Sequence, residues 1–315
     1  MNLSRREMVA RSFGALVSGG IGGSPLRAAV RDGFFRRQNL ELGIVLYMLG
    51  DEFEKDPEGT LKAIARIGYR RIEGFLDVVA RPDVQAAMQR SGLTCNSVAI
   101  MPSPPGSPWR EQLKRDIEAA QRIGVRFVGT PIFPLPARPS TVIHESLPAA
   151  MARIRATMDV GHWKRIADQL NEQGRMLNDA GLRLYYHNHN IEFYPLDGRT
   201  PLDILLRNTA PDLVSFEMDA GWVRAAGKDP VTLLRRHPHR FQLMHLKDMT
   251  RATKANFALS MESTEIGQGI IDWKYIVHAA QAEGIREFYV EQEPPFSRSR
   301  IEAAEMSFRY LAAMD

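Results

Sequence analysis

The sequence predicts an α/β fold, a single (β/α)₈ TIM barrel. From about Leu40 to the C-terminus, short apolar runs alternate eight times with stretches whose apolar residues recur every three or four positions. Such regular alternation implies right-handed βαβ units and therefore a parallel sheet. Eight units in roughly 270 residues match the size of a closed barrel. The alternative is an open doubly wound sheet, but no glycine-rich dinucleotide fingerprint follows the first apolar run.

The predicted strands are the eight short apolar runs. In chain order they are Leu42–Tyr47, Arg71–Phe75, Thr94–Ile100, Phe127–Thr130, Leu182–His187, Val214–Asp219, Gln242–Leu246 and Phe288–Glu291. Because the C-terminal ends of all strands meet at one face of such a barrel, that face is expected to hold the active site.

The predicted helices show amphipathic spacing between these strands. They are Pro57–Ile67, Pro82–Arg90, Trp109–Ile123, His162–Ala180, Pro201–Leu206, Pro230–Arg236, Trp273–Glu283 and Arg300–Ala313. Three of them begin with a capping residue followed by proline, at Asp56, Thr200 and Asp229. Two long loops, Pro131–Ser140 and Met249–Gly269, follow strands, so we expect both at the active face as lids or substrate walls.

The N-terminal residues 1–29 are predicted to be an export signal rather than part of the barrel. Arg5 and Arg6 precede a short, weakly apolar, glycine-rich run. A basic start, a short apolar stretch and small residues are typical of a secretory signal, and the paired arginines resemble a twin-arginine leader. We therefore expect a barrel domain over residues 30–315 and a periplasmic or otherwise exported protein. The alternative is a disordered basic tail.

The composition narrows the classes of partner. The chain of 315 residues is 44% hydrophobic and 25% charged, with a net charge of +4. Its basic residues form no stripe with interleaved aromatics, which argues against nucleic-acid binding. No later stretch is long and apolar enough to anchor the chain in a membrane. The single cysteine, Cys95, excludes an intramolecular disulfide and a cysteine-rich zinc site. A homo-oligomer is compatible with this composition.

Metal-ligating residue types stand at the ends of the last four predicted strands. His187, Asp219 and Glu291 each end one of these strands, and His245 is the next-to-last residue of the remaining one. Two nitrogen and two oxygen ligands suit a divalent ion. We predict one ion, with Mn²⁺ as the first choice and Zn²⁺, Co²⁺, Fe²⁺ or Mg²⁺ as alternatives. The competing interpretation is four isolated, hydrogen-bonded polar residues.

The chain also resembles the xylose-isomerase-like (β/α)₈ superfamily of sugar phosphate isomerases and epimerases. The segments that carry this resemblance are Gly43–Tyr47, Asp56–Leu61, Ile67–Glu73, His187–His189, Met218–Val223, His245–Asp248, Glu265–Gly269 and Tyr289–Glu293. The resemblance implies one divalent metal, held by Glu, Asp, His and Glu on the last four strands. Asp219, His245 and Glu291 match three of those positions. His187 stands where epimerases of the family carry Glu, and Glu192 is the alternative ligand there.

The predicted chemistry is proton abstraction next to a carbonyl. A metal that holds a ketone and its neighbouring hydroxyl would stabilise an enediolate, while a side chain moves the proton. The candidate catalytic residues are Glu291, His189 and Lys247. The candidate substrate contacts are Tyr47, Glu73 and Trp222. We therefore predict a metal-dependent isomerase or epimerase of a small-molecule sugar or keto sugar.

Two other functions stay open on the sequence. A lyase or hydratase could eliminate the aglycone from 3-keto-glycosides, because the same proton abstraction precedes loss of a β-leaving group. An exported sugar-binding protein without catalysis is the other alternative. It is favoured by His187, which replaces one of the two glutamates that family epimerases use to pass a proton.

Overall fold

The computed structural model describes residues 33–103, 107–135 and 145–315. The predicted export signal, residues 1–29, lies outside these ranges, as do residues 136–140 of the first long loop. Within them, no helix combines the length and the apolar character that crossing a membrane requires.

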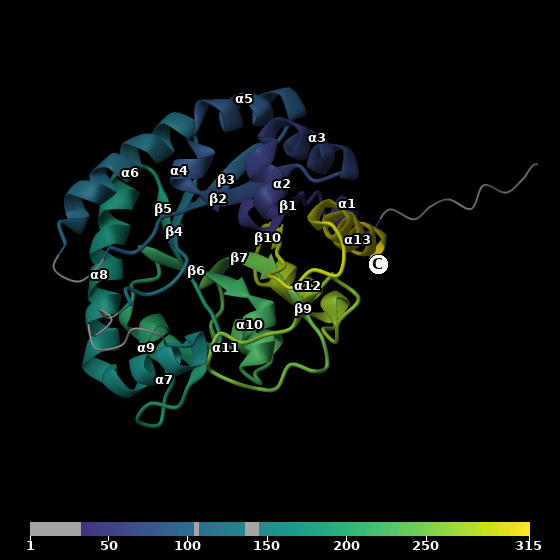
Figure 1. Cartoon of the computed structure of the whole chain (residues 1–315). Coiled ribbons are helices and arrows are strands. Elements are labelled where there is room, and N and C mark those ends of the chain that lie inside the picture. The colour runs from purple at the N-terminus through teal and green to yellow at the C-terminus, as the bar shows by residue number, and fades with distance from the viewer. Residues whose placement is uncertain (1–32, 104–106, 136–144) are drawn as a thin grey trace, which may run out of the picture. The chain divides into compact units, whose positions relative to one another are not determined.

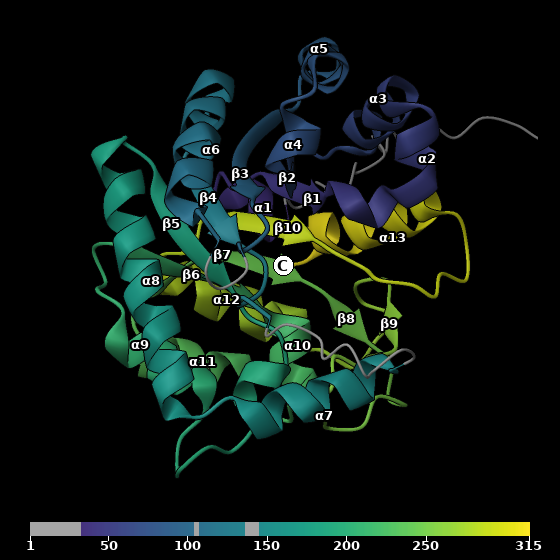
Figure 2. The same cartoon turned by 60° about the vertical axis from the view of Figure 1, so that its left-hand side comes forward.

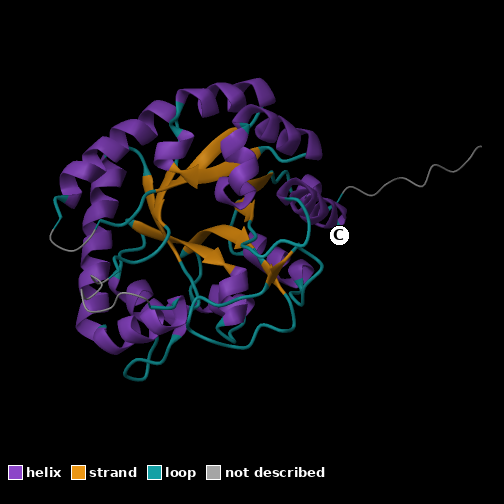
Figure 3. Ribbon diagram, viewed as in Figure 1, coloured by secondary structure: helices purple, strands orange, loops and turns teal. Residues whose placement is uncertain are grey.

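Eight parallel strands close into a barrel, which confirms the predicted fold class. The strands are β1 (Leu42–Val45), β2 (Arg71–Phe75), β3 (Thr94–Ala99), β4 (Phe127–Thr130), β5 (Arg183–His187), β6 (Val214–Asp219), β7 (Phe241–Leu246) and β10 (Glu287–Val290). Around the ring they run β1-β10-β7-β6-β5-β4-β3-β2. Figure 3 shows the strands as an inner ring with helices outside it.

The eight predicted helices form around this ring, with ends that differ from prediction by at most two residues (Figure 1). They are α3 (Pro57–Ile67), α5 (Pro82–Ser91), α6 (Trp109–Ile123), α8 (Val160–Asp179), α9 (Pro201–Asn208), α11 (Pro230–Arg236), α12 (Trp273–Ala282) and α13 (Arg300–Ala313). The predicted caps form: Asp56, Thr200 and Asp229 each accept backbone N–H bonds at the start of their helices.

Several short elements were not predicted. They are α1 (Phe34–Arg37), η1 (Leu46–Leu49), α2 (Gly50–Lys55), α4 (Leu76–Val79), α7 (Leu147–Thr157), η2 (Ile191–Phe193) and α10 (Ala220–Ala225). Most are only one or two turns long, too short for a clear helical period. One of them corrects the first strand: β1 ends at Val45, and Tyr47 lies in the 3₁₀ turn η1 rather than in the sheet.

The second long loop contains a small sheet, which corrects its prediction as a loop throughout. Here β8 (Asp248–Met249) pairs antiparallel with β9 (Ser263–Thr264), outside the barrel wall (Figure 2). The loop is also tied to the segment after β5, because Asn190 donates to Asn256 Oδ1 at 2.8 Å and accepts from Leu259 N–H at 3.1 Å. These bonds hold the loop beside the end of β5.

The barrel interior carries an apolar layer below the predicted ligands. A separate apolar cluster consists of Val45, Phe127, Tyr185, Leu243 and Tyr289. The last three each stand two residues before a predicted ligand on the same strand, so they point into the same interior one layer deeper. This packed layer supports the site from beneath.

Candidate active site and metal centre

The four predicted ligands meet at the C-terminal face of the barrel. His187 and Asp219 end β5 and β6, His245 lies in β7, and Glu291 directly follows β10. All four side chains are buried, and one ligand atom from each lies within 4.8 Å of the other three. Asp219 and His245 are register partners on neighbouring strands. Residues far apart along the chain therefore converge here.

The donor set fits a divalent cation. Asp219 Oδ1 accepts the Trp222 N–H at 2.8 Å and caps α10, whereas Oδ2 receives no hydrogen bond. His187 Nε2 lies 3.9 Å from this free oxygen. Burial, reinforced by nearby His245, lowers the pKa of His187 well below its usual value, so the imidazole is neutral and can act as a ligand.

His245 lies between two carboxyl groups. Its Nε2 lies 2.8 Å from Glu73 Oε1, and its Nδ1 lies 2.8 Å from Glu291 Oε2. A neutral imidazole has one N–H, so only one of these contacts can be a hydrogen bond to a carboxylate. The other contact requires an additional proton or a cation. Glu73, a predicted substrate contact, thus lies directly behind a predicted ligand.

Glu217 is a site residue that the sequence analysis missed. Its Oε2 lies 2.9 Å from His187 Nδ1 and 3.3 Å from His245 Nε2. A carboxyl group in this place contacts and orients both imidazoles. Burial, and then repulsion from Glu73, raises the pKa of Glu217 well above its usual value. The sequence did contain a signal for Glu217, because Glu217 and Asp219 are two residues apart on one strand and therefore share its inward face.

Lys247 lies among three carboxylates. Its fully buried Nζ is 2.8 Å from Glu293 Oε1, 3.0 Å from Glu291 Oε1 and 3.4 Å from Asp219 Oδ2. Burial raises the pKa of Asp219, and Lys247 opposes that rise. Burial also tends to raise the pKa of Glu293, but the attraction of Lys247 is stronger, and the pKa of Glu293 is lowered. Glu293 was not among the predicted site residues.

The cavity above these residues has a volume of about 270 Å³. Tyr47, Glu73 and His189, which are candidates for substrate contacts or catalysis, line this cavity. Lys247 and Trp222 are not among its described lining residues. Instead, the Trp222 ring packs 4.8 Å from Lys247 Nζ and 5.6 Å from the His189 ring. Trp222 therefore lies behind the catalytic candidates.

His189 is a neutral imidazole at the cavity wall. Burial, helped by the positive charge of Lys247, lowers the pKa of His189 to about 3. Its Nδ1 is buried and has no hydrogen-bond partner among the residues described. A neutral imidazole that lines a cavity has one ring nitrogen with a free lone pair and can therefore take part in proton transfer.

Glu192 lies outside the four-ligand group and supports the loop that carries His189. The Tyr186 hydroxyl donates to Glu192 Oε1 at 2.6 Å, and the His189 backbone N–H donates to Oε2 at 2.9 Å. Both oxygens are therefore used within the segment after β5. The geometry groups His187, rather than Glu192, with the other three candidate ligands.

The buried Glu192 predicts a pH-dependent stability. Burial raises its pKa to about 7. Between the usual carboxyl pKa and 7, the folded state retains a proton that the unfolded state has lost, so stability falls as pH rises. Urea unfolding at about pH 5 and about pH 7.5 should show this loss, of at most a few kcal/mol. The Glu192→Gln variant should lose less stability between these two pH values. An equal loss in the variant and the unaltered protein would contradict the prediction.

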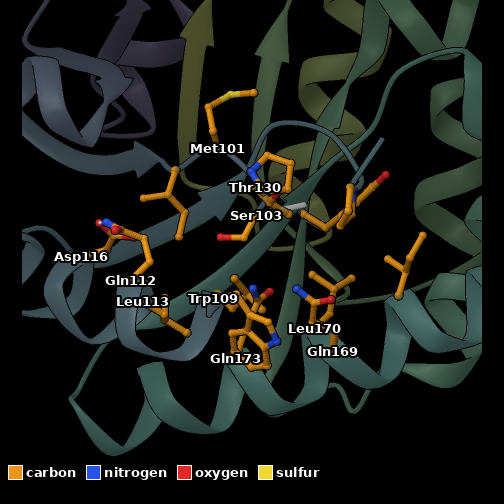
Figure 4. A pocket seen from close by; sticks show the side chains of 16 residues that line it. Met101, Ser103, Trp109, Gln112, Leu113, Asp116, Thr130, Gln169, Leu170 and Gln173 are labelled. Carbon is orange, nitrogen blue, oxygen red and sulfur yellow. Dashed lines mark hydrogen bonds between the residues drawn. The ribbon is translucent and has the colours of Figure 1, made fainter. Parts of the chain in front are cut away.

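A second hollow lies outside the barrel, between α6 and α8 (Figure 4). Side chains of Trp109, Gln112, Leu113, Leu170 and Gln173 line it. Its volume of about 20 Å³ holds little more than one water molecule. The cavity over the four candidate ligands is therefore the better place for a small-molecule substrate.

Known proteins place the chain in a family. The profile described as "Xylose isomerase-like TIM barrel" matches residues 61–314. Inosose dehydratase from Geobacillus thermodenitrificans is 29% identical over 145 residues, which are 42% of this chain and 48% of the relative. Inosose dehydratase from Lacticaseibacillus casei is 27% identical over 163 residues, 48% of this chain and 54% of the relative. The alignments thus span about half the length of these curated relatives.

A solved structure extends the likeness over most of the chain. A sugar phosphate isomerase/epimerase from Parabacteroides distasonis superimposes with a TM-score of 0.69 and 25% identity. The match covers 87% of this chain and 94% of that one. The profile match, which includes seven of the eight barrel strands, shows the family directly. The chain belongs to the xylose isomerase-like TIM barrel family.

Proposed function

We propose that this protein is a metal-dependent isomerase or epimerase that removes and returns a proton next to the carbonyl of a sugar or keto sugar. One observation carries the proposal: two imidazoles and two carboxylates converge beside a sugar-sized cavity. His187, Asp219, His245 and Glu291 would hold the ion. A divalent ion bound there supplies Lewis acidity to a carbonyl oxygen.

The remaining residues provide the proton chemistry. His189 accepts the proton, because its ring is neutral and its Nδ1 is unpartnered. Lys247 balances the charge of Glu291 and Asp219 and keeps the Glu291 carboxylate in position. Glu291 is the alternative base. The His189 ring is unprotonated near neutral pH, so it need not lose a proton before it takes one from the substrate.

Two proton-transfer groups approach the cavity from opposite sides. Tyr47 follows β1 and His189 follows β5, and these strands are four positions apart around the ring of eight. Both side chains line the cavity. In the proposed reaction, His189 and Tyr47 would lie on opposite sides of a bound sugar ring. Removal of a proton on one face and return on the other gives epimerisation.

Solvent deuterium tests the proposal. When the Mn²⁺-loaded protein is incubated with a panel of keto sugars in D₂O, at least one sugar should acquire deuterium at the carbon next to its carbonyl. NMR measures this incorporation. The metal-free protein should incorporate none. If no sugar in the panel acquires deuterium with the metal-loaded protein, the proposed reaction is wrong.

Elimination of a leaving group is the second candidate. The specific observation in its favour is that both curated relatives described above are named dehydratases. Loss of water or an aglycone follows the same proton abstraction when a leaving group stands β to the carbonyl. Mass spectrometry of the product distinguishes the two reactions, because isomers keep the mass of the substrate and elimination products do not.

A further inference from the structure

We infer that the N-terminal mouth of the barrel, opposite the candidate active site, is a binding site for a small soluble phosphate, such as a phosphate ester or pyrophosphate. This inference goes beyond the proposed function and does not depend on it. A cavity of about 280 Å³ lies at this mouth, a volume near the lower end for small-molecule sites. Residues at the starts of β4, β7 and β10 line it, and these are Arg126, Phe127, Phe241, Gln242, Arg286 and Glu287.

The arginines of this cavity belong to a pattern that recurs along the chain. Several strands are preceded by a glycine and a buried apolar or aromatic residue, with an arginine at the start of the strand or directly before it. The four segments are Gly68–Arg70, Gly124–Arg126, Gly181–Arg183 and Gly284–Arg286. Each glycine has a positive φ, between 74° and 131°. Because parallel strands all begin at one end of a barrel, the pattern brings arginines to its N-terminal mouth.

Arg126 and Arg286 come from opposite sides of the strand ring. Arg126 directly precedes β4 and Arg286 directly precedes β10, and these strands are four positions apart in the ring of eight. The guanidinium carbon of Arg126 is 5.1 Å from the centre of the Phe127 ring, which belongs to the apolar cluster inside the barrel. A tetrahedral phosphate offers oxygens in several directions, so one phosphate can accept paired N–H donors from both guanidinium groups.

The positive charge of these two side chains is not balanced nearby. In the part of the chain that the structure describes, neither Arg126 nor Arg286 forms an ion pair. Two carboxylates also line the cavity, but Glu287 is already paired with Arg71. Glu283 is the other, so two guanidinium groups stand against one remaining carboxylate. The lining therefore has an excess of positive charge, which favours an anion.

The rest of the lining supports such an interaction. Phe127 and Phe241 are buried and contribute apolar surface to the cavity. A guanidinium group next to apolar surface is less well hydrated, so its attraction to an anion is stronger than in open solvent. Two neutral side chains add hydrogen-bonding groups, the amide of Gln242 and the ring of His239. The cavity thus combines the charge and the donors that bind a phosphate.

Calorimetric titration of the full-length protein with inorganic pyrophosphate tests the inference. At constant ionic strength, we expect saturable binding with a Kd below about 1 mM. The Arg126→Gln and Arg286→Gln variants should each bind at least about 10-fold more weakly, because each loses a charged hydrogen-bond donor. Both side chains are exposed, so both variants should keep the unfolding temperature of the unaltered protein. Unchanged affinity in both variants, or no binding up to about 10 mM pyrophosphate, would overturn the inference.

Two control variants locate the bound pyrophosphate. Arg251→Gln removes the same charge from an exposed residue in the long loop after β7, at the other end of the barrel, and should leave the Kd unchanged. Asp219→Asn alters the candidate metal centre, where a bound ion could hold pyrophosphate, and should also leave the Kd unchanged. Weaker binding in Asp219→Asn would place the anion at the active face and overturn the inference. Equal weakening in Arg251→Gln and Arg126→Gln would show only an effect of net charge and would overturn it as well.

Discussion

Replacing Asp219 with asparagine should remove the bound metal and leave the fold intact. The variant loses the charge of Oδ2, which accepts no hydrogen bond and lies near His187 and Lys247. Asparagine keeps an oxygen that can accept the Trp222 N–H, and it is as good a helix cap as aspartate. We expect metal affinity to fall by at least about 100-fold, more than for a residue that only orients a ligand.

The measurement is metal content after dialysis, by inductively coupled plasma mass spectrometry, with thermal unfolding in parallel. Asp229→Asn is the matched control, because Asp229 also caps a helix but lies outside the site. That control should hold as much metal as the unaltered protein. If Asp219→Asn also retained its metal at full stoichiometry, the proposed ligand set would be wrong. Loss of metal together with collapse of the thermal transition would point to a structural role instead.

Replacing His189 with glutamine should abolish proton exchange while the metal stays bound. The ring lines the cavity but lies outside the group of four candidate ligands. Loss of a general base typically lowers the rate by about 10²–10⁴-fold. Because the pKa of His189 is lowered to about 3, its ring is unprotonated at every pH well above that value. The exchange rate of the unaltered protein should therefore not fall between about pH 8 and about pH 5 through titration of this residue.

Deuterium exchange and metal content are measured on the same samples of this variant. His237→Gln is the control, since His237 follows α11 and precedes β7 at the opposite end of the barrel. It should exchange at the unaltered rate. Exchange at the normal rate in His189→Gln would assign the base to Glu291. Loss of metal from the same variant would make His189 a ligand rather than a base.

Much of the fold followed from local patterns. Strand and helix ends were predictable to within about two residues where caps and prolines marked them, as at Asp56 and Thr200. The same periodicity placed the four candidate ligands at the strand ends. Short elements such as η1 and the β8–β9 pair were missed because a few residues carry no period. Tyr47 was thus assigned to a strand, although the chain leaves the sheet two residues earlier.

The side-chain contacts around the site could not be predicted from local sequence patterns. Glu217 and Glu293 act through contacts with His187 and Lys247, and each pair comes from separate strands or loops. The sequence left Glu192 as an alternative metal ligand. In the structure its two oxygens accept hydrogen bonds from the Tyr186 hydroxyl and the His189 backbone N–H. The pairings of Glu217 and Glu293 depend on how separate strands and loops are placed side by side, and no local pattern encodes them.

The sequence by itself determined the barrel, the face that carries the site and the residue types at the strand ends. It could do so because hydrophobic periodicity and caps are local properties of the chain. Only the tertiary structure decided which carboxyl groups contact which imidazoles and that the Trp222 ring packs against Lys247. It also decided that Asp248 accepts a hydrogen bond from the backbone N–H of Gly267. The physical reason is that these contacts join strands and loops distant in sequence, and burial there sets both charge and chemistry.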